Sequence, residues 1–132
     1  MIDIVAECSG AKTIGISGHI KPDGDCIGAT LALSLYLQKR LPKAEITVFS
    51  DEISSCFDCV EGIKQFNFTF DKEQPEIFIV VDTTDSRIGN AERYFKNAKK
   101  TINIDHHISN AEGCAMVNYV VPTASSASEL IY

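Results

Sequence analysis

The sequence predicts an α/β protein built on a doubly wound, mostly parallel sheet with helices on both faces. Short runs of β-branched and aromatic residues alternate with helical segments along the 132 residues, which is the pattern of parallel strands joined by crossover helices. Three of these runs end in aspartate or histidine residues. Since the carboxyl ends of parallel strands face one crevice, these side chains should meet there.

The chain begins with an expected strand and a long helix. Thr13–Ser17 is a short apolar strand, and Gly15 and Gly18 indicate close backbone approach beside it. The segment 27–41 has the composition of a helix that is apolar almost all round, which predicts that it is buried. Pro42 ends this helix, because proline cannot continue the hydrogen-bonding pattern.

The remaining elements continue the alternation. Residues 76–82 form the clearest strand, because they are mostly β-branched or aromatic. Residues 54–63 are ambiguous, with a short helix closed by Gly62 as the preferred interpretation. The other expected elements are a strand at 45–50, a helix at 91–99, strands at 101–105 and 115–121, and a helix begun by the capping box Ser126-x-x-Glu129.

Composition and charge argue against several classes of protein. The net charge of −6 disfavours a basic groove for long nucleic acids, and no apolar stretch approaches the roughly 20 residues of a membrane span. The first residues are acidic where a secretion signal is basic, so we expect a cytoplasmic protein with its five cysteines reduced. The glycine-rich motifs of dinucleotide-binding and P-loop proteins do not occur, which removes the main support for those functions.

The polar residues at the strand ends form a mixed carboxylate and imidazole set. Such a set suits Mn²⁺, Mg²⁺ or Fe²⁺, whereas structural zinc sites favour thiolates. The expected ligands are His19, Asp23, Asp25, Asp82 and His106. Asp82 follows the middle run, so it is the best candidate to bridge two ions that share a hydroxide. Asp105 would orient an imidazole through its ring N–H, and His107 would face the substrate and donate to a phosphate oxygen.

Each of these residues also has an ordinary alternative. A single aspartate after a strand, such as Asp23 or Asp25, is more often a helix cap or turn former. The joint occurrence of these residues at three strand ends favours the metal site over that alternative. The pair Cys56-x-x-Cys59 offers a zinc half-site or a redox pair, but no second pair completes a zinc site. We interpret the cysteines as small apolar residues, although oxidation of Cys26 could disturb the adjacent site.

The motifs resemble those of the DHH phosphoesterase superfamily. The residues that carry the resemblance are His19-x-x-x-Asp23-x-Asp25, Asp82-Thr83, Asp105-His106-His107 and Ala124-Ser125-Ser126-x-x-Glu129. The branch that combines oligoribonuclease and phosphoadenosine-phosphate phosphatase activities is the most similar. The resemblance implies hydrolysis of very short RNAs (nanoRNA), or of 3′-phosphoadenosine 5′-phosphate, with two Mn²⁺ ions. The alternatives are a cyclic or linear dinucleotide phosphodiesterase and a non-catalytic metal- or nucleotide-binding fragment.

The resemblance also implies which residue serves which ion. His19 and Asp23 would hold one metal, Asp25 and His106 the other, and Asp82 would bridge them. A further aspartate ligand and a C-terminal substrate-binding domain would lie beyond residue 132, so residues 1–132 are expected to be a truncated DHH domain that holds the second ion weakly. The expected partner is a short RNA or nucleotide substrate, with no membrane and no long duplex nucleic acid, while a homodimer stays open.

Overall fold

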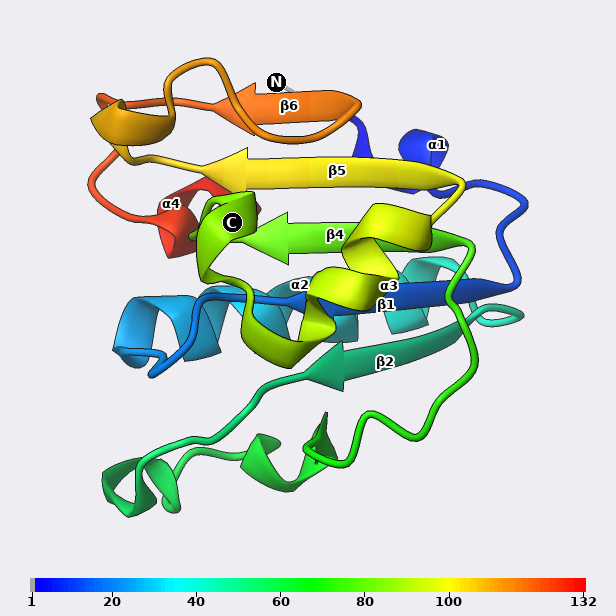
Figure 1. The fold of residues 1–132 in the computed structure, drawn as a ribbon, viewed down its shortest axis with the longest axis horizontal. Helices are drawn as coiled ribbons and strands as arrows, with labels where there is room; N and C mark the ends of the chain where they lie inside the picture. Colours follow the sequence, from blue (N-terminus) through cyan, green and yellow to red (C-terminus); the bar gives the residue numbers. More distant parts are fainter. Residues whose placement is uncertain (1) are drawn as a thin grey trace.

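A computed structural model describes residues 2–132 as one six-stranded sheet with helices on both faces (Figure 1). The strand order is β3-β2-β1-β4-β5-β6, and each neighbouring pair is parallel. The predicted α/β class and doubly wound sheet are therefore confirmed. The strands are β1 (Thr13–Ser17), β2 (Glu45–Phe49), β3 (Phe66–Asn67), β4 (Ile77–Val81), β5 (Lys100–Asp105) and β6 (Val117–Val120).

The direction of winding changes between β1 and β4. The chain runs outward from β1 through β2 to β3, then returns to place β4 on the other side of β1 with Ile14 opposite Ile77. From β4 it continues outward through β5 to β6. In an open parallel sheet, ligands bind outside the carboxyl ends of the strands at such a reversal. The arrowheads in Figure 1 mark that edge of the sheet.

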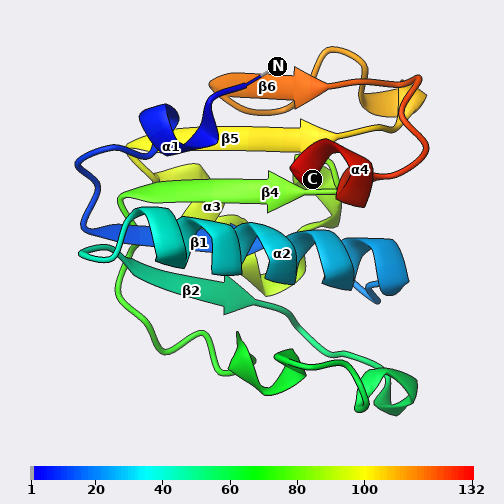
Figure 2. The same cartoon turned by 180° about the vertical axis from the view of Figure 1, so that it is seen from behind.

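The helices divide between the two faces. Figure 2 shows α1 (Ile4–Glu7), α2 (Gly24–Arg40) and α4 (Ala127–Ile131) in front of the sheet, while α3 (Glu92–Asn97) lies behind it. The apolar core is split in the same way. One cluster joins α2 to the sheet through residues such as Ile16, Leu33 and Ile79. The other packs Phe49, Phe78, Tyr94 and their neighbours against α3.

The long helix departs from its prediction at its start and in its burial. It begins at Gly24 rather than at residue 27, because the Asp23 side chain accepts a hydrogen bond from the Cys26 N–H and caps the helix. The expectation that α2 is buried all round is wrong. Leu35 and Tyr36 are 52% and 43% exposed, and Tyr36 lines an open groove shared with residues of α1 and α4.

Several other boundaries also differ. The ambiguous segment 54–63 forms no α-helix; it contains the 3-10 turn Ser55–Phe57, and a second turn, Ile63–Gln65, follows Gly62. The helix predicted at 91–99 and the strand predicted at 115–121 are both shorter, as α3 and β6. Helix α1 and strand β3 were not predicted, since four and two residues are too few to give a periodic pattern.

The close backbone approach expected at two glycines is present. A side chain at Gly15 would overlap the Phe78 ring, and one at Gly18 would overlap the Cys26 sulfur. Gly15 therefore lets the second apolar cluster pack against β1, and Gly18 leaves room for the first turn of α2. Within residues 2–132, no helix combines the length and apolar character needed to cross a membrane.

Candidate metal centre

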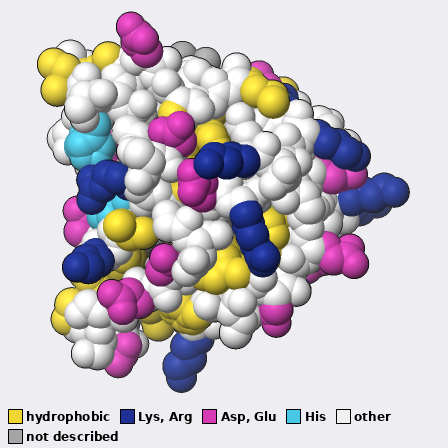
Figure 3. Space-filling view, viewed as in Figure 1, with side chains coloured by type: hydrophobic (Ala, Val, Ile, Leu, Met, Phe, Trp, Pro, Cys, Tyr) yellow, Lys and Arg dark blue, Asp and Glu magenta, His cyan; other side chains and the backbone are white. Residues whose placement is uncertain are grey.

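The predicted polar residues converge at the winding reversal. His19 follows β1, Asp82 follows β4, and His106 follows β5. The two oxygens of Asp82 point to different partners: Oδ2 lies 3.7 Å from His19 Nε2 and Oδ1 lies 3.4 Å from His106 Nε2. Figure 3 shows histidine side chains at the edge of the molecule toward which the strands of Figure 1 point, with lysine and arginine side chains beside them.

Asp82 is held in an unusual backbone conformation. Its φ of 57° lies in the left-handed region, which aspartate and asparagine tolerate better than most residues. Its N–H donates to the Ile104 carbonyl, which fixes the end of β4 against β5. The residue is buried, and Oδ1 has no hydrogen-bond partner among residues 2–132. A buried carboxylate oxygen without a donor is costly, so this atom indicates a position for a cation.

The ring nitrogens of His19 and His106 are arranged as metal sites require. Nδ1 of His19 lies 2.8 Å from the Ile20 carbonyl, and Nδ1 of His106 lies 3.3 Å from the Ala124 carbonyl. We assign the ring proton to Nδ1 in both, because a carbonyl oxygen only accepts. The two Nε2 atoms then face Asp82, and each offers a lone pair to an ion when its ring is neutral. Metal-binding histidines usually donate their second ring N–H to a carbonyl or carboxylate in this way.

Comparison with known proteins identifies the family. A sequence model described as "DHH family, N-terminal domain" matches residues 13–132. The chain belongs to the DHH family. It is 31% identical over 129 residues to the "Probable bifunctional oligoribonuclease and PAP phosphatase NrnA" of Streptococcus mutans, covering 97% of this chain and 40% of that protein.

The fold is also shared with a solved structure. An exopolyphosphatase-related protein from Bacteroides fragilis superposes with a TM-score of 0.81 at 23% identity, over 98% of this chain and 40% of that one. The chain thus spans about 40% of the length of the relatives it matches. DHH phosphoesterases depend on metal ions. The Nε2 atoms that face Asp82 and the unpartnered Asp82 oxygen of this DHH domain fit that requirement.

The electrostatics of the metal-free DHH site favour positive charge. The Asp82 carboxylate, followed by the Cys26 side chain, raises the pKa of His19 from 6.5 to about 10. At neutral pH a proton is therefore bound where the imidazole would otherwise meet a metal. An entering ion would have to displace this proton, because a ligand imidazole offers a lone pair.

Asp25 is shared between the site and helix α4. Its Oδ2 lies 3.7 Å from His106 Nε2 and also accepts the Ala127 N–H at 2.8 Å. Its Oδ1 accepts both the N–H and the hydroxyl of Ser128, at 2.9 and 2.6 Å. Partial burial raises the pKa of Asp25, but the hydrogen bonds from Ser128 and Ala127 outweigh burial and hold it below its usual value. Asp25 therefore faces His106 as an anion that is already oriented.

Asp23 combines the two roles that the sequence left open. Its Oδ1 accepts the Cys26 N–H at 3.0 Å and so caps α2. The same oxygen lies 3.9 Å from His19 Nε2. The side chain is 67% exposed, which makes it the most accessible of the expected ligands. The capping alternative is thus correct for Asp23, and its position beside His19 is compatible with metal binding as well.

Asp105 lies at the centre of a buried hydrogen-bond network. Its Oδ1 accepts the His107 ring Nδ1–H at 2.7 Å and the His106 backbone N–H at 2.8 Å. Its Oδ2 accepts the Asn110 side-chain amide at 2.7 Å, and the same amide donates to Asn103 at 2.9 Å. Asp105 therefore orients His107 directly and fixes the backbone of His106, while its predicted role in catalysis stays a prediction.

Two supporting residues of this network were missed from the sequence. Asn103 and Asn110 are buried, and the Asn110 amide donates both to Asp105 Oδ2 and to the side-chain oxygen of Asn103. Asn103 could have been predicted from the sequence, because a polar residue inside an otherwise apolar strand requires a hydrogen-bond partner. The role of Asn110 could not have been predicted, since this residue belongs to the 3-10 turn Ile108–Asn110, whose position depends on the fold.

The cysteine pair takes no part in a recognisable site. Cys56 and Cys59 are both exposed around a 3-10 turn. Among residues 2–132, neither belongs to a group of three or more side chains that could hold a metal. The zinc alternative therefore gains no support, and the redox alternative stays a prediction. The interpretation of these two cysteines as small apolar residues also fails to explain why they face solvent.

Proposed function

We propose that this DHH domain hydrolyses phosphate esters of short nucleotides with two divalent ions. The observation that carries the proposal is the placement of Asp82, whose two carboxylate oxygens face His19 on one side and His106 on the other. A carboxylate in that position can bridge two ions. Two ions held there would activate a water near neutral pH and would stabilise the charge that develops in a phosphoryl displacement.

Each ion would have one histidine and one aspartate of its own and would share Asp82 with the other ion. His19 and Asp23 would hold one ion, His106 and Asp25 the other, and Asp82 both. The ions are Mn²⁺ in this proposal, with Mg²⁺ and Fe²⁺ as chemically suitable alternatives. His107 donates its Nδ1–H to Asp105, so its Nε2 carries a proton only as an imidazolium. In that form it would donate to a phosphate oxygen of the substrate, as the sequence analysis expected.

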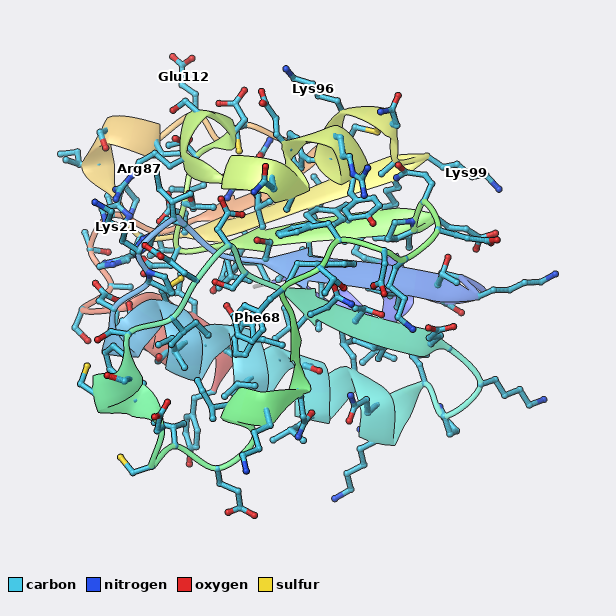
Figure 4. All side chains as sticks on the ribbon, turned by 60° about the horizontal axis from the view of Figure 1, so that its bottom comes forward. Lys21, Phe68, Arg87, Lys96, Lys99 and Glu112 are labelled. Carbon is cyan, nitrogen blue, oxygen red and sulfur yellow. The ribbon has the colours of Figure 1, made fainter. Side chains whose placement is uncertain are left out.

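Two basic residues beside the site support an anionic substrate. Lys21 and Arg87 are labelled close together in Figure 4, at the end of the sheet opposite Lys99. The Ile20 N–H donates to the Arg87 carbonyl at 2.8 Å, which ties their two loops together. The positive side chains offset the carboxylates for an approaching phosphate. The similarity to the probable oligoribonuclease and PAP phosphatase of Streptococcus mutans supports a substrate in which the phosphate belongs to a short nucleotide.

The direct test is a hydrolysis assay on matched substrates. Purified protein is incubated with 3′-phosphoadenosine 5′-phosphate, a linear diribonucleotide or a cyclic dinucleotide, in Mn²⁺ and in excess chelator. We expect phosphate or mononucleotide release in Mn²⁺ from the first or second substrate, and none with chelator. Turnover of the cyclic dinucleotide alone would favour the phosphodiesterase alternative. Metal binding without turnover of any substrate would favour the non-catalytic alternative.

Arg87 provides a test of the substrate side. Arg87→Ala removes a positive side chain but leaves the backbone carbonyl that accepts from Ile20. We expect KM to rise about tenfold or more with little change in metal affinity, since charged hydrogen bonds contribute about 1.5–3 kcal/mol. Lys99→Ala is the matched control, because Lys99 pairs with Glu76 at the other end of the sheet. Equal effects from both variants would show that overall charge, and not position, governs binding.

A further inference from the structure

A thiol lies among the ligands on the His19 side of the site. The potential ligand atoms of His19, Cys26 and Asp82 all lie within 4.8 Å of one another, and all three residues are buried. We propose that Cys26 is a ligand of the first metal ion, and that its sulfur raises the affinity of this position for softer cations such as Zn²⁺ or Co²⁺ relative to Mn²⁺ and Mg²⁺. The proposal rests on the two-ion centre proposed above and adds a ligand to it.

The start of α2 fixes where the sulfur lies. Cys26 stands in the first turn of the helix, where its N–H donates to Asp23. Cys26 is buried, and its sulfur lies against the backbone of Gly18, in space that any larger residue at position 18 would fill. Gly18 directly precedes His19. The loop that presents the imidazole is thus also the loop that makes room for the thiol.

The spacing of the ligand atoms also points to an ion between these groups. Asp82 Oδ2, the carboxylate oxygen on the His19 side, lies 3.7 Å from His19 Nε2, beyond hydrogen-bond distance. Two ligand atoms of one tetrahedral ion are separated by a similar distance when metal–nitrogen and metal–oxygen bonds are about 2.0–2.2 Å. The spacing therefore fits an ion between the groups better than it fits direct contact.

The ligand chemistry of the two positions differs. Histidine, carboxylate and thiolate together are typical of zinc and of other borderline cations, because soft sulfur ligands favour them. The position near His106 offers imidazole and carboxylate groups, which suit Mn²⁺ or Mg²⁺. Binding at the first position would release the thiol proton of Cys26 and the imidazole proton of His19 to solvent, leaving a thiolate and a neutral imidazole as ligands.

Cobalt spectroscopy tests the proposal without relying on turnover. Co²⁺ bound by a thiolate gives a sulfur-to-metal charge-transfer absorption in the near ultraviolet, which oxygen and nitrogen ligands do not. We expect this band to grow with the first equivalent of Co²⁺ in the wild type. It should be absent in Cys26→Ser and Cys26→Ala, and unchanged in a Cys56→Ser, Cys59→Ser, Cys114→Ser triple variant. No band in the folded wild type, or a band that persists without Cys26, would overturn the proposal.

Metal competition supplies a second measurement. The ratio of Zn²⁺ to Mn²⁺ affinity should fall at least about tenfold in Cys26→Ser, since even the loss of an outer hydrogen-bond partner costs about 10–100-fold in metal affinity. An unchanged ratio in a folded Cys26→Ser protein would show that the thiol only fills space. Because the cobalt band is read in the wild type and in the triple variant, it decides the question even where the Cys26 variants fold poorly. A protein that shows the band but hydrolyses no nucleotide would refute the proposed function and leave this inference standing.

Discussion

The two sides of Asp82 are built in different ways. On one side, His19 and Cys26 come from a single stretch that runs from the end of β1 into α2. On the other side, His106 meets Asp25, whose carboxylate is held by Ala127 and Ser128, 102 and 103 positions further along the chain. The first position is therefore determined by local structure, whereas the second depends on how α4 docks.

Burial follows the same division for every expected ligand except Asp23, which belongs to the first position and is 67% exposed. The His19 and Asp82 side chains are 8% and 3% exposed, whereas those of His106 and Asp25 are 22% and 23% exposed. A buried position with a preset geometry can discriminate between metals, because its ligands cannot rearrange to suit each ion. A half-open position assembled from distant segments is better placed to receive a substrate phosphate. The comparison predicts that most mutations will weaken metal binding at one position and not at the other. Asp82, which both positions share, is the exception.

The largest effect is expected at that shared residue. Asp82→Asn should abolish binding at both positions and reduce turnover below detection, because a neutral amide cannot bridge two cations. Asparagine is the appropriate replacement, since it tolerates the left-handed φ of 57° that alanine would strain. Calorimetric metal titration and the hydrolysis assay measure both losses.

A matched control separates charge from position at Asp82. Asp71→Asn removes one carboxylate from an exposed loop outside the metal cluster. It should leave metal stoichiometry and turnover unchanged. Wild-type turnover by a folded Asp82→Asn protein in saturating Mn²⁺ would rule out the bridging role.

A smaller loss is expected at Asp105, which supports the His106 side without facing an ion. Asp105→Asn places an amide donor where the carboxylate now accepts from His107, from the His106 backbone and from Asn110. We expect turnover to fall about 10–100-fold, and the free energy of unfolding to fall by about 1–3 kcal/mol for the buried group left without a partner. Steady-state kinetics and chemical denaturation measure the two effects.

The comparison variant for Asp105 is Asn110→Ala. It removes one donor to Oδ2 and leaves the contact to His107 intact, so its kinetic effect should be the smaller of the two. A larger kinetic loss for Asn110→Ala than for Asp105→Asn would mean that the network positions the histidines through Asn110.

The pH dependence of metal binding should be steepest on the His19 side. Because the metal-free pKa of His19 is raised to about 10, an ion must displace its proton at neutral pH, and apparent affinity should rise up to about tenfold per pH unit for that one proton. Calorimetry in buffers of different protonation enthalpy counts the protons released. Measurement in Cys26→Ser isolates the His19 contribution, which should be close to one proton. Release of none would show that His19 is already neutral.

The same raised pKa has a consequence for the stability of the metal-free protein. The folded value lies above the ordinary 6.5, so the His19 proton stabilises the metal-free fold fully below about pH 6.5. This stabilisation is lost as the pH rises toward about 10. Thermal unfolding in chelator should therefore show a decline over that interval that His19→Gln lacks. A parallel decline in both proteins would assign the effect to other groups.

The sequence predicted the parts of the site that follow from strand ends. His19, Asp82 and His106 each follow an apolar run, and parallel strands bring such residues together whatever the details of the loops. Cys26 and Ser128 could not be predicted in the same way. The direction of the thiol depends on the helix beginning at Gly24, and the contact of Ser128 with Asp25 depends on the docking of a five-residue helix. Neither property leaves a periodic pattern in the sequence.

The smallest effect on metal binding is expected at Ser128. Its replacement tests whether the Ser128 hydroxyl or the docking of α4 as a whole orients Asp25. Ser128→Ala removes the hydroxyl that donates to Asp25 Oδ1 at 2.6 Å, while the Ser128 backbone N–H still reaches that oxygen. We expect metal affinity at the His106 position to fall by up to about tenfold, in line with about 1–1.5 kcal/mol for one hydrogen bond of several, with no change at the His19 position.

Ser126→Ala is the control, because Ser126 caps α4 by accepting the Glu129 N–H and donates nothing to Asp25. It should cost about 1 kcal/mol of stability without a selective loss at either position. If Ser126→Ala weakened the His106 position as much as Ser128→Ala did, the docking of α4 as a whole, and not the hydroxyl of Ser128, would set the geometry of Asp25.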